Sequence, residues 1–248
     1  AFVEFIEKVP FYGLAVLCLD HPDVQELLPR VQRRHVTYGI SPQADYSARG
    51  VQVQGVSTSF DAFRRGEPLG QFTVRMPGHH NVLNTLAAIA VADELEVPLD
   101  VMKTALATFH GVARRFSVVD VAEGVALVDD YGHHPAEIRA TLAAARSAYQ
   151  NKVLVAFQPH RYTRTQHLFD DFARAFNDAD LVLLTDIYSA GEAPIEGVDS
   201  ERLAEALRAH GHHGARYVPD RDELVRQLGA AASAGDVVIA LGAGDINR

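Results

Sequence analysis

The sequence predicts an α/β protein whose C-terminal part is a doubly wound, Rossmann-like domain with a mostly parallel sheet. After residue 112, apolar runs such as KVLVAF and DVVIALGAG alternate with amphipathic helical segments, an order typical of a parallel sheet covered on both faces. Residues 46–76 instead alternate polar and apolar side chains, which favours an antiparallel hairpin or meander. A chain of 248 residues with 48% hydrophobic content is long enough for two domains.

The first domain is expected over residues 1–112. Strands are predicted at 14–20 and 35–41, with a helical stretch between them, as in part of a βαβ unit. The meander follows, with its turn at RRGEPLG, and then two helices at NVLNTLAAIAVADELEVP and PLDVMKTALATFH. Gly111 ends the second helix, which places the domain boundary near residue 112.

The second domain is expected over residues 113–248. It opens with the strand-like runs SVVDV and GVALVDDY, and a helix then begins at Pro135. The remaining strands and helices are predicted in strict alternation: strand KVLVAF, helix HLFDDFARAFNDA, strand DLVLLTDIY, helix SERLAEALRAHG, strand ARYVP, helix DRDELVRQLGAAASAG and strand DVVIALGAG.

Composition excludes several classes of protein. The formal net charge of −9 repels nucleic acid and anionic membranes, so an anionic ligand needs a local basic cluster. Cys18 is the single cysteine and lies in an apolar run, where it is expected to be a core residue in a reducing compartment. No apolar run approaches the roughly 18 residues of a membrane span, and no signal peptide is visible. A cytoplasmic location is therefore expected.

Basic residues follow the strand KVLVAF, in the stretch FQPHRYTRT. His160, Arg161 and Arg164 leave the end of a predicted parallel strand, where ligands of such sheets bind. A guanidinium group at this place is suited to a carboxylate or phosphate. The alternative is that these side chains cap helices or pair with Asp170 and Asp171 on the surface.

The stretch DDYGHHP ends another predicted strand. Asp129 or Asp130 is expected to face the same crevice, where a carboxylate accepts ribose hydroxyls. His133 and His134 are candidates for a metal ligand, a general base or a cationic contact, and the alternative is a turn that starts a helix. Adjacent histidines without cysteines or further ligands at zinc spacing are a weak metal signal, so no metal ligand is assigned.

Two asparagines lie in the stretch PGHHNVLN. Asn81 is in a position to cap the helix that follows. Asn84 lies one turn further and presents an amide that suits the edge of a purine.

These stretches together resemble the ATP-dependent Mur ligases of bacterial cell-wall synthesis. The resemblance covers essentially all 248 residues in the family's order, and DDYGHHP and FQPHRYTRT resemble the branch that joins L-alanine to UDP-N-acetylmuramate. The murein tripeptide-recycling ligase resembles the chain around DYGHHP but not at FQPHRYTR. The strings that carry the resemblance are PGHHNVLNTLAAIAVA, GVARRF, LVDDYGHHPAEIRATLAAAR, FQPHRYTRT, LFDDFARAF, DIYSAGEAPIEGVDS and GAGDI.

The resemblance implies a reaction and a role for each matching residue. The muramic carboxylate takes the γ-phosphoryl group of ATP to form an acyl phosphate, which the amine of L-alanine then attacks. Chemistry of this kind depends on positioning and charge stabilisation. The implied nucleotide-binding residues are Asn81 and Asn84 for adenine, Arg115, and Asp130 for the ribose. The implied substrate-binding residues are Tyr131, His133, His160, Arg161 and Arg164, of which His133, His160 and Arg161 are the catalytic candidates.

One departure from the family matters for function. The sequence contains no G-x-x-x-x-G-K-[ST] motif, although the family holds the triphosphate with such a P-loop and Mg²⁺ with a glutamate and histidine that follow it. The first domain is therefore expected to be the second half of the family's central ATP-binding domain, and the isolated chain to be an inactive fragment. ATP and Mg²⁺ are expected in the intact enzyme, whose missing N-terminal half is a possible partner. The alternatives are a non-catalytic module that binds a nucleotide or peptidoglycan precursor, and a hydrolase with a metal at the histidine pairs.

Overall fold

A computed structural model describes residues 2–247 and divides the chain into two compact units between His110 and Gly111. Unit 1 (Ala1–His110) and unit 2 (Gly111–Arg248) each contain one sheet and one main hydrophobic core. The α/β class, the mostly parallel sheet of unit 2 and the antiparallel segment of unit 1 confirm the predicted fold class.

The sheet of unit 1 has the order β1-β2-β3-β4-β5. The first three strands are parallel, and the last three form the predicted antiparallel meander. A two-residue turn joins β4 to β5; both of its residues, Arg65 and Gly66, have positive φ angles (50° and 86°), as a tight hairpin requires. The strands are β1 (Ala15–Cys18), β2 (His35–Gly39), β3 (Tyr46–Gln54), β4 (Ser57–Arg64) and β5 (Glu67–Val74).

Helices α3 and α4 of unit 1 pack an apolar face against this sheet. Leu86 and Ile89 of α3 and Met102 of α4 are buried in one cluster with Phe60 and Phe72, whose rings stack 6.2 Å apart. Burial of such side chains is the main source of stability for a layer of helices on a sheet. The helices are α1 (Phe2–Glu7), α2 (Pro22–Leu27), the 3₁₀ helix η1 (Leu28–Arg30), α3 (His79–Glu94) and α4 (Leu99–Thr108).

The sheet of unit 2 has the order β10-β9-β8-β11-β7-β6. Every neighbouring pair is parallel except β6 and β7. Strand β11, which comes last in the sequence, lies between β7 and β8. The strands are β6 (Ser117–Ala122), β7 (Val125–Asp130), β8 (Val153–Phe157), β9 (Leu181–Leu184), β10 (Ala215–Tyr217) and β11 (Val237–Leu241).

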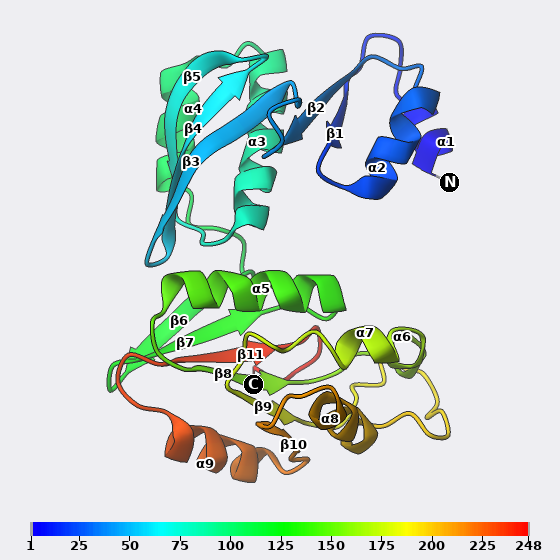
Figure 1. Ribbon diagram of the computed structural model, residues 1–248, viewed down its shortest axis with the longest axis vertical. Coiled ribbons are helices and arrows are strands. Elements are labelled where there is room, and N and C mark those ends of the chain that lie inside the picture. The colour runs from blue at the N-terminus through cyan, green and yellow to red at the C-terminus, as the bar shows by residue number, and fades with distance from the viewer. Residues whose placement is uncertain (1, 248) are drawn as a thin grey trace. The chain divides into compact units, whose positions relative to one another are not determined.

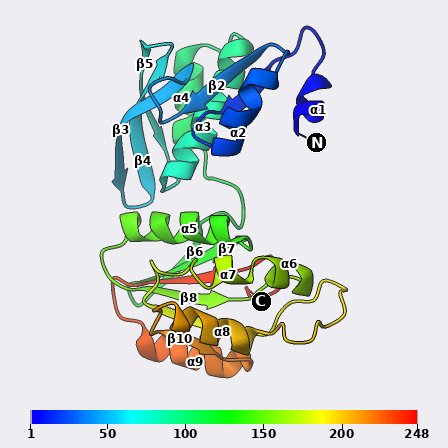
Figure 2. The ribbon, with the colours of Figure 1, turned by 45° about the vertical axis from the view of Figure 1, so that its right-hand side comes forward.

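Helices cover both faces of this sheet, so its central strands are apolar throughout. Val153, Val155 and Phe157 of β8 belong to one cluster with α5, α7 and α8, whereas Leu154 and Ala156 pack with α9 on the other face. Figures 1 and 2 both place α5 and α9 on opposite sides of the sheet. The helices are α5 (Pro135–Ala148), α6 (Tyr162–His167), α7 (Phe169–Phe172), α8 (Ser200–Ala209) and α9 (Arg221–Ala231).

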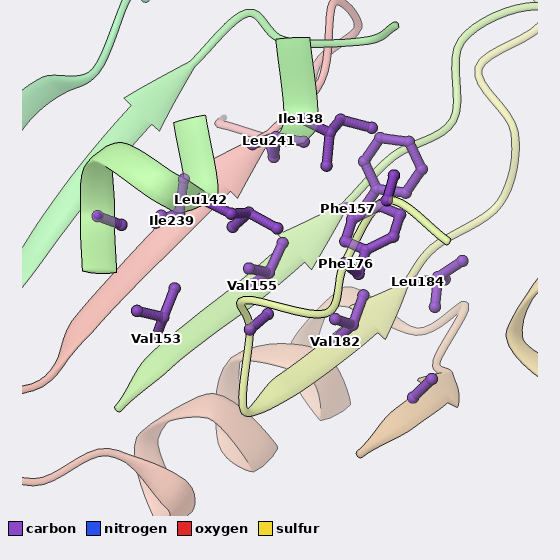
Figure 3. Packing of buried hydrophobic residues seen from close by; sticks show 14 of the residues in the cluster. Ile138, Leu142, Val153, Val155, Phe157, Phe176, Val182, Leu184, Ile239 and Leu241 are labelled. Carbon is purple, nitrogen blue, oxygen red and sulfur yellow. The ribbon is translucent and has the colours of Figure 1, made fainter. Parts of the chain in front are cut away.

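Phe157, the last residue of β8, lies at the centre of the larger cluster. It is fully buried, and its ring centroid is 5.0 Å from that of Phe176 and 5.8 Å from that of Phe172. Figure 3 shows the Phe157 and Phe176 rings side by side, with Ile138 of α5 nearby. The polar residues that follow β8 therefore start from a rigid, apolar base.

One helix differs from its prediction. A single helix was expected over HLFDDFARAFNDA, but α6 begins earlier, at Tyr162, and α7 ends at Phe172. The early start has a long-range cause: Glu192 accepts hydrogen bonds from the amide and hydroxyl of Thr163 (3.0 and 2.8 Å) in the first turn of α6. Beyond α7 the chain continues in tight turns that bury Phe176.

Among residues 2–247, no helix combines the length and apolar character needed to cross a lipid bilayer.

Replacement of Phe157 by alanine is expected to destabilise unit 2 by about 3–5 kcal/mol, because it removes a buried ring and leaves a cavity. Val225, whose side chain is 65% exposed on α9, provides the control: Val225→Ala should change stability by no more than about 0.5 kcal/mol. Hydrogen exchange of the β8 and β11 amides measures the opening free energy of this unit. Equal protection in the two variants would contradict the packing described above.

Unit 1 is expected to open more readily than unit 2 in an isolated monomer. Strand β1 pairs only with β2 among the described strands, and the nearby Phe2, Phe5, Phe11 and Tyr12 are between 72% and 87% exposed. An open sheet edge and exposed apolar surface leave less burial to oppose local opening. The amides of β1 and β2 should therefore exchange faster than those of β8 and β11. Equal protection, with a monomer established by sedimentation, would refute this expectation, whereas a partner chain on β1 would raise the protection of unit 1.

Candidate ligand site at the carboxyl end of the unit 2 sheet

Four parallel strands of unit 2 end level with one another. Their registers pair Leu184 with Phe157, Phe157 with Leu241, and Leu241 with Asp130. The stretches DDYGHHP, QPHRYTR, DIYSAGE and GAGD therefore all leave the sheet from the same edge. The carboxyl edge of a doubly wound sheet is the usual place for a ligand.

Four rings from three of these stretches form a continuous row along the edge. The ring centroids of Tyr131 and His133 lie 5.2 Å apart, those of His133 and His160 5.9 Å apart, and those of His160 and Tyr188 5.4 Å apart. Tyr131 and Tyr188 are 37% and 40% exposed. The structure thus brings together three of the residues singled out from the sequence and adds Tyr188, which the sequence did not single out.

His133 has a defined tautomer. Its Nδ1 atom lies 3.0 Å from the carbonyl oxygen of Tyr131, and since a carbonyl only accepts, Nδ1 carries the proton. The carboxylate of Glu137 lies 3.5 Å from the same nitrogen and also accepts from the backbone amides of His133 and His134. In the neutral ring, Nε2 of His133 is therefore a free proton acceptor.

His160 has the opposite tautomer. Its Nδ1 atom lies 3.1 Å from Nη1 of Arg164, and because a guanidinium group only donates, Nδ1 accepts and Nε2 carries the proton. Burial lowers the pKa of His160, and the charges of Arg164, of His133 when it is protonated, and of Arg161 lower it further, against a smaller opposing effect of Glu192. His160 is thus a neutral hydrogen-bond donor through Nε2.

The two arginines of FQPHRYTRT are held differently. Arg164 lies on α6, is half-buried, and donates from Nη1 to the backbone oxygen of His160 as well as to its ring (both 3.1 Å). Arg161 precedes α6 with a φ angle of 73°, and its half-exposed guanidinium group is 3.6 Å from Glu192. Hydrogen bonds from the amide and hydroxyl of Thr163 lower the pKa of Glu192. The remaining guanidinium donors of both arginines are available to an anion.

Asp130 lies behind the row and organises the backbone. It is 3% exposed, and its two oxygens accept hydrogen bonds from the amides of Phe116 and Gly132 (both 2.7 Å). Burial raises the pKa of this carboxyl, and the two amides oppose the rise. The Thr141 hydroxyl opposes the rise as well, and the first task of Asp130 is to fix the turn that carries Tyr131.

The two arginines of GVARRF lie at the Tyr131 end of the row. Arg115 is half-exposed, with Nη1 3.3 Å from Glu137 and its guanidinium carbon 5.8 Å from the Tyr131 ring centre. Arg114, which the sequence did not single out, is closer to the ring at 5.0 Å and donates to the backbone oxygen of Gly242 (2.6 Å). The adjacent arginines before a strand were the sequence signal for a basic group at this place. Which of them lies closer to the Tyr131 ring depends on the backbone, because Arg114 has a φ angle of 59°.

His134 takes the role that its alternative predicted, at the start of a helix. It is the N-cap of α5, where its Nδ1 accepts from the amide of Ala136 (3.2 Å) and Glu137 completes a capping box. A histidine that uses its ring nitrogen in this way is not directed at the row.

The two asparagines belong to unit 1. The N-cap of α3 is Gly78, with a φ angle of 98°, so Asn81 is not the cap; its buried side chain donates to the backbone oxygen of Pro77 instead (2.8 Å). Asn84 is exposed, and its amide nitrogen is 3.5 Å from the side-chain oxygen of Asn81. The amide of Asn84 is therefore nearly free for a ligand.

The described residues offer no arrangement for a divalent cation. Among residues 2–247, no cluster of three or more His, Cys, Asp or Glu side chains is placed to hold a metal ion. One buried carboxylate oxygen, Oδ1 of Asp129, lacks a hydrogen-bond partner, while Oδ2 accepts from Asn247 (2.8 Å). The site as a whole is suited to anions and hydrogen-bonding groups.

Two family models match the chain: the Mur ligase middle domain over residues 1–92 and the Mur ligase glutamate ligase domain over residues 114–244. The UDP-N-acetylmuramate–L-alanine ligases of Sorangium cellulosum and Myxococcus xanthus are 69% and 54% identical to it. The matches cover 100% of this chain, but only 53% and 52% of those proteins, so the chain spans about half the length of the curated relatives it matches.

Solved structures give the same family. The crystal structure of UDP-N-acetylmuramate-alanine ligase from Thermotoga maritima has a TM-score of 0.73 and 27% identity, and it covers 98% of this chain and 59% of that one. The MurF ligase of the same organism in complex with ADP shares the fold (TM-score 0.74) at 19% identity, with 99% of this chain and 53% of that chain covered. The chain therefore belongs to the Mur ligase family, with the family's middle and C-terminal domains.

Proposed function

We propose that this chain is the amino-acid-binding part of a ligase that joins L-alanine to the carboxylate of UDP-N-acetylmuramate at the expense of ATP. Relatives that are 69% and 54% identical carry that name. The single observation that supports the proposal most is the group of His160, Arg161 and Arg164 beside the proton acceptor His133. The carboxylate of an amino acid suits His160, Arg161 and Arg164, and its amine suits His133.

The proposed reaction has two steps. The muramic carboxylate attacks the γ-phosphorus of ATP, which releases ADP and leaves an acyl phosphate. The amine of L-alanine then attacks the acyl carbon, and inorganic phosphate leaves from the tetrahedral intermediate as the amide forms. The amine enters as ammonium and must lose one proton before it attacks and another as the amide forms. Positioning and charge stabilisation supply most of the catalysis in such transfers.

Each residue of the row has a proposed task. Arg161 and Arg164 hold the alanine carboxylate through the guanidinium donors that remain free. His160 donates from Nε2 to an oxygen of the carboxylate or the acyl phosphate. His133 takes a proton from the amine at Nε2, as Glu137 and the Tyr131 carbonyl fix its ring. Tyr131 provides an apolar wall for the muramyl group.

The nucleotide contacts are also proposals, made separately for each unit. In unit 1 the exposed amide of Asn84 contacts adenine, and the buried Asn81 orients it. In unit 2 Arg115 contacts the nucleotide with a half-exposed guanidinium group, and Asp130 accepts a ribose hydroxyl through its remaining lone pairs. Because Asp130 is buried, its contact with the ribose requires the turn at residues 130–132 to rearrange.

Phosphoryl transfer from ATP needs groups that this sequence does not contain. It has no P-loop motif, so we assign the triphosphate and Mg²⁺ to no residue of this chain. When bound, Mg²⁺ would neutralise phosphate charge during transfer. We propose that the missing N-terminal half of the enzyme supplies these groups, and that the exposed Phe2, Phe5 and Phe11 beside strand β1 belong to the surface that it covers. The expected cytoplasmic location also remains a prediction.

The isolated chain is expected to release no phosphate from ATP in the presence of UDP-N-acetylmuramate and L-alanine, because it lacks a P-loop. A form extended upstream through a P-loop should release one phosphate for each amide formed. Phosphate release and product mass measure both. Activity of the short chain would overturn the account of the missing groups. Nucleotide or precursor binding without activity in either form would favour a non-catalytic module, and a preference of the extended form for a tripeptide would favour the recycling ligase.

Arg164→Gln in the extended form is expected to raise the KM for L-alanine about 10- to 100-fold, since a charge-assisted hydrogen bond contributes roughly 1.5–3 kcal/mol. Arg174→Gln, which removes an exposed guanidinium group beyond α7, is the matched control and should leave KM unchanged. Initial rates at varied L-alanine concentration provide the test. An equal effect of both substitutions would show that Arg164 acts through overall charge rather than at the site.

A further inference from the structure

Tyr188 is bound to the His160 segment through its backbone as well as its ring. The Tyr188 amide donates to the oxygen of Pro159, and the Arg161 amide donates to the oxygen of Tyr188 (both 2.8 Å), so residues 160 and 188 form an isolated parallel bridge beyond β8 and β9. Their rings are stacked: the ring planes are 15° from parallel, and the centroids are 5.4 Å apart. Stacked neighbours of this kind restrict each other's side-chain torsions.

The GAGD turn also packs against the Tyr188 ring. A Cβ atom on Gly244 would lie 2.9 Å from Cγ and 3.0 Å from Cδ2 of Tyr188, and closer still to Oε1 of Gln158. The turn is itself fixed, because Gln158 donates to the Asp245 side chain and accepts from the Asp245 amide (both 2.9 Å). Tyr188 is therefore held by two contacts, the ring of His160 and a clamped turn that has room only for glycine.

His160 is thereby constrained on two sides by different means. The Tyr188 ring stacks on the imidazole, and Arg164 donates to its Nδ1 atom. We propose that Tyr188 is a positioning residue for His160: it keeps the imidazole in the orientation that Arg164 locks as the neutral Nε2–H tautomer, so that Nε2 stays a donor for an anionic substrate oxygen. The identity of that oxygen rests on the proposed function, but the tautomer does not.

The charges around His160 act in the same direction. Arg164, His133 and Arg161 disfavour a second proton on the ring, and Glu192 alone among the identified neighbours favours it. Burial is the largest contribution to the lowered pKa of His160. Removal of the Tyr188 ring admits water to the imidazole, so it should raise this pKa toward the ordinary value and allow the proton to exchange between the two nitrogens.

Nitrogen-15 NMR of the histidine rings in the 248-residue chain, followed over pH without any ligand, tests the proposal. We expect the neutral His160 ring of the unaltered chain to carry its proton on Nε2 alone. Tyr188→Phe should preserve this state, because it keeps the ring, whereas Tyr188→Ala should give a mixture of tautomers and a higher pKa. Tyr131→Ala removes the ring at the other end of the row, which contacts His133, and should leave the His160 tautomer unchanged.

A second variant guards against a simple loss of folding. Gly244→Ala displaces the Tyr188 ring without deleting it, and should also mix the tautomers of His160 while the circular dichroism of the chain stays intact. A single Nε2–H tautomer in both Tyr188→Ala and Gly244→Ala would overturn the proposal, as would a proton on Nδ1 in the unaltered chain.

Kinetics of the extended form separate this proposal from the proposed function. Tyr188→Ala should lower kcat/KM about tenfold, the effect of misplacing one hydrogen bond to a charged group, and Tyr188→Phe should restore it. If the extended form has no ligase activity, the proposed function fails, while the NMR result still decides the role of Tyr188. If activity is present but Tyr188→Ala keeps both full activity and the single tautomer, only the positioning role is lost.

Discussion

The parallel register of β9, β8, β11 and β7 is the constraint on which the rest of unit 2 depends. It places Leu184, Phe157, Leu241 and Asp130 directly beside one another across the sheet. The polar stretches that follow these residues start level with one another, from strands about 4.8 Å apart. Rings from three of the stretches therefore meet at centroid distances of 5.2 to 5.9 Å. A shift of register by one residue would turn every side chain of the shifted strand to the other face of the sheet.

Two histidines of the same row are chemically different because their neighbours differ. A backbone carbonyl fixes the proton of His133 on Nδ1, whereas a guanidinium group removes it from Nδ1 of His160. In their neutral forms the two rings therefore present one proton acceptor, Nε2 of His133, and one donor, Nε2 of His160. A site that handles an amine and a carboxylate at once needs both, and two rings with the same tautomer would supply only one of them.

The sequence predicted much of the architecture because burial leaves a direct trace in composition. Strands covered on both faces are apolar throughout, as β8 is, and the alternation in residues 46–76 marked the meander of unit 1. The prediction of a single helix around α6 and α7 was wrong, because the first turn of α6 is stabilised by Glu192, 29 residues after Thr163. No local sequence pattern indicates such a contact. The edge at which the polar stretches gather was likewise predictable from strand order. The stacking of Tyr188 and the proximity of Arg114 to Tyr131 were not, because they depend on the backbone torsions of single residues and on the turn after β11.

The position of β11 has a consequence for how unit 2 reaches its fold. Strand β11 follows the other described strands of unit 2 along the chain but completes the middle of the sheet, so β7 and β8 cannot find their common neighbour until residues 237–241 have been synthesised. Contacts between residues far apart in sequence slow folding. A nascent chain that ends before Val237 presents two apolar, unpaired strand edges that face each other, a state prone to aggregation.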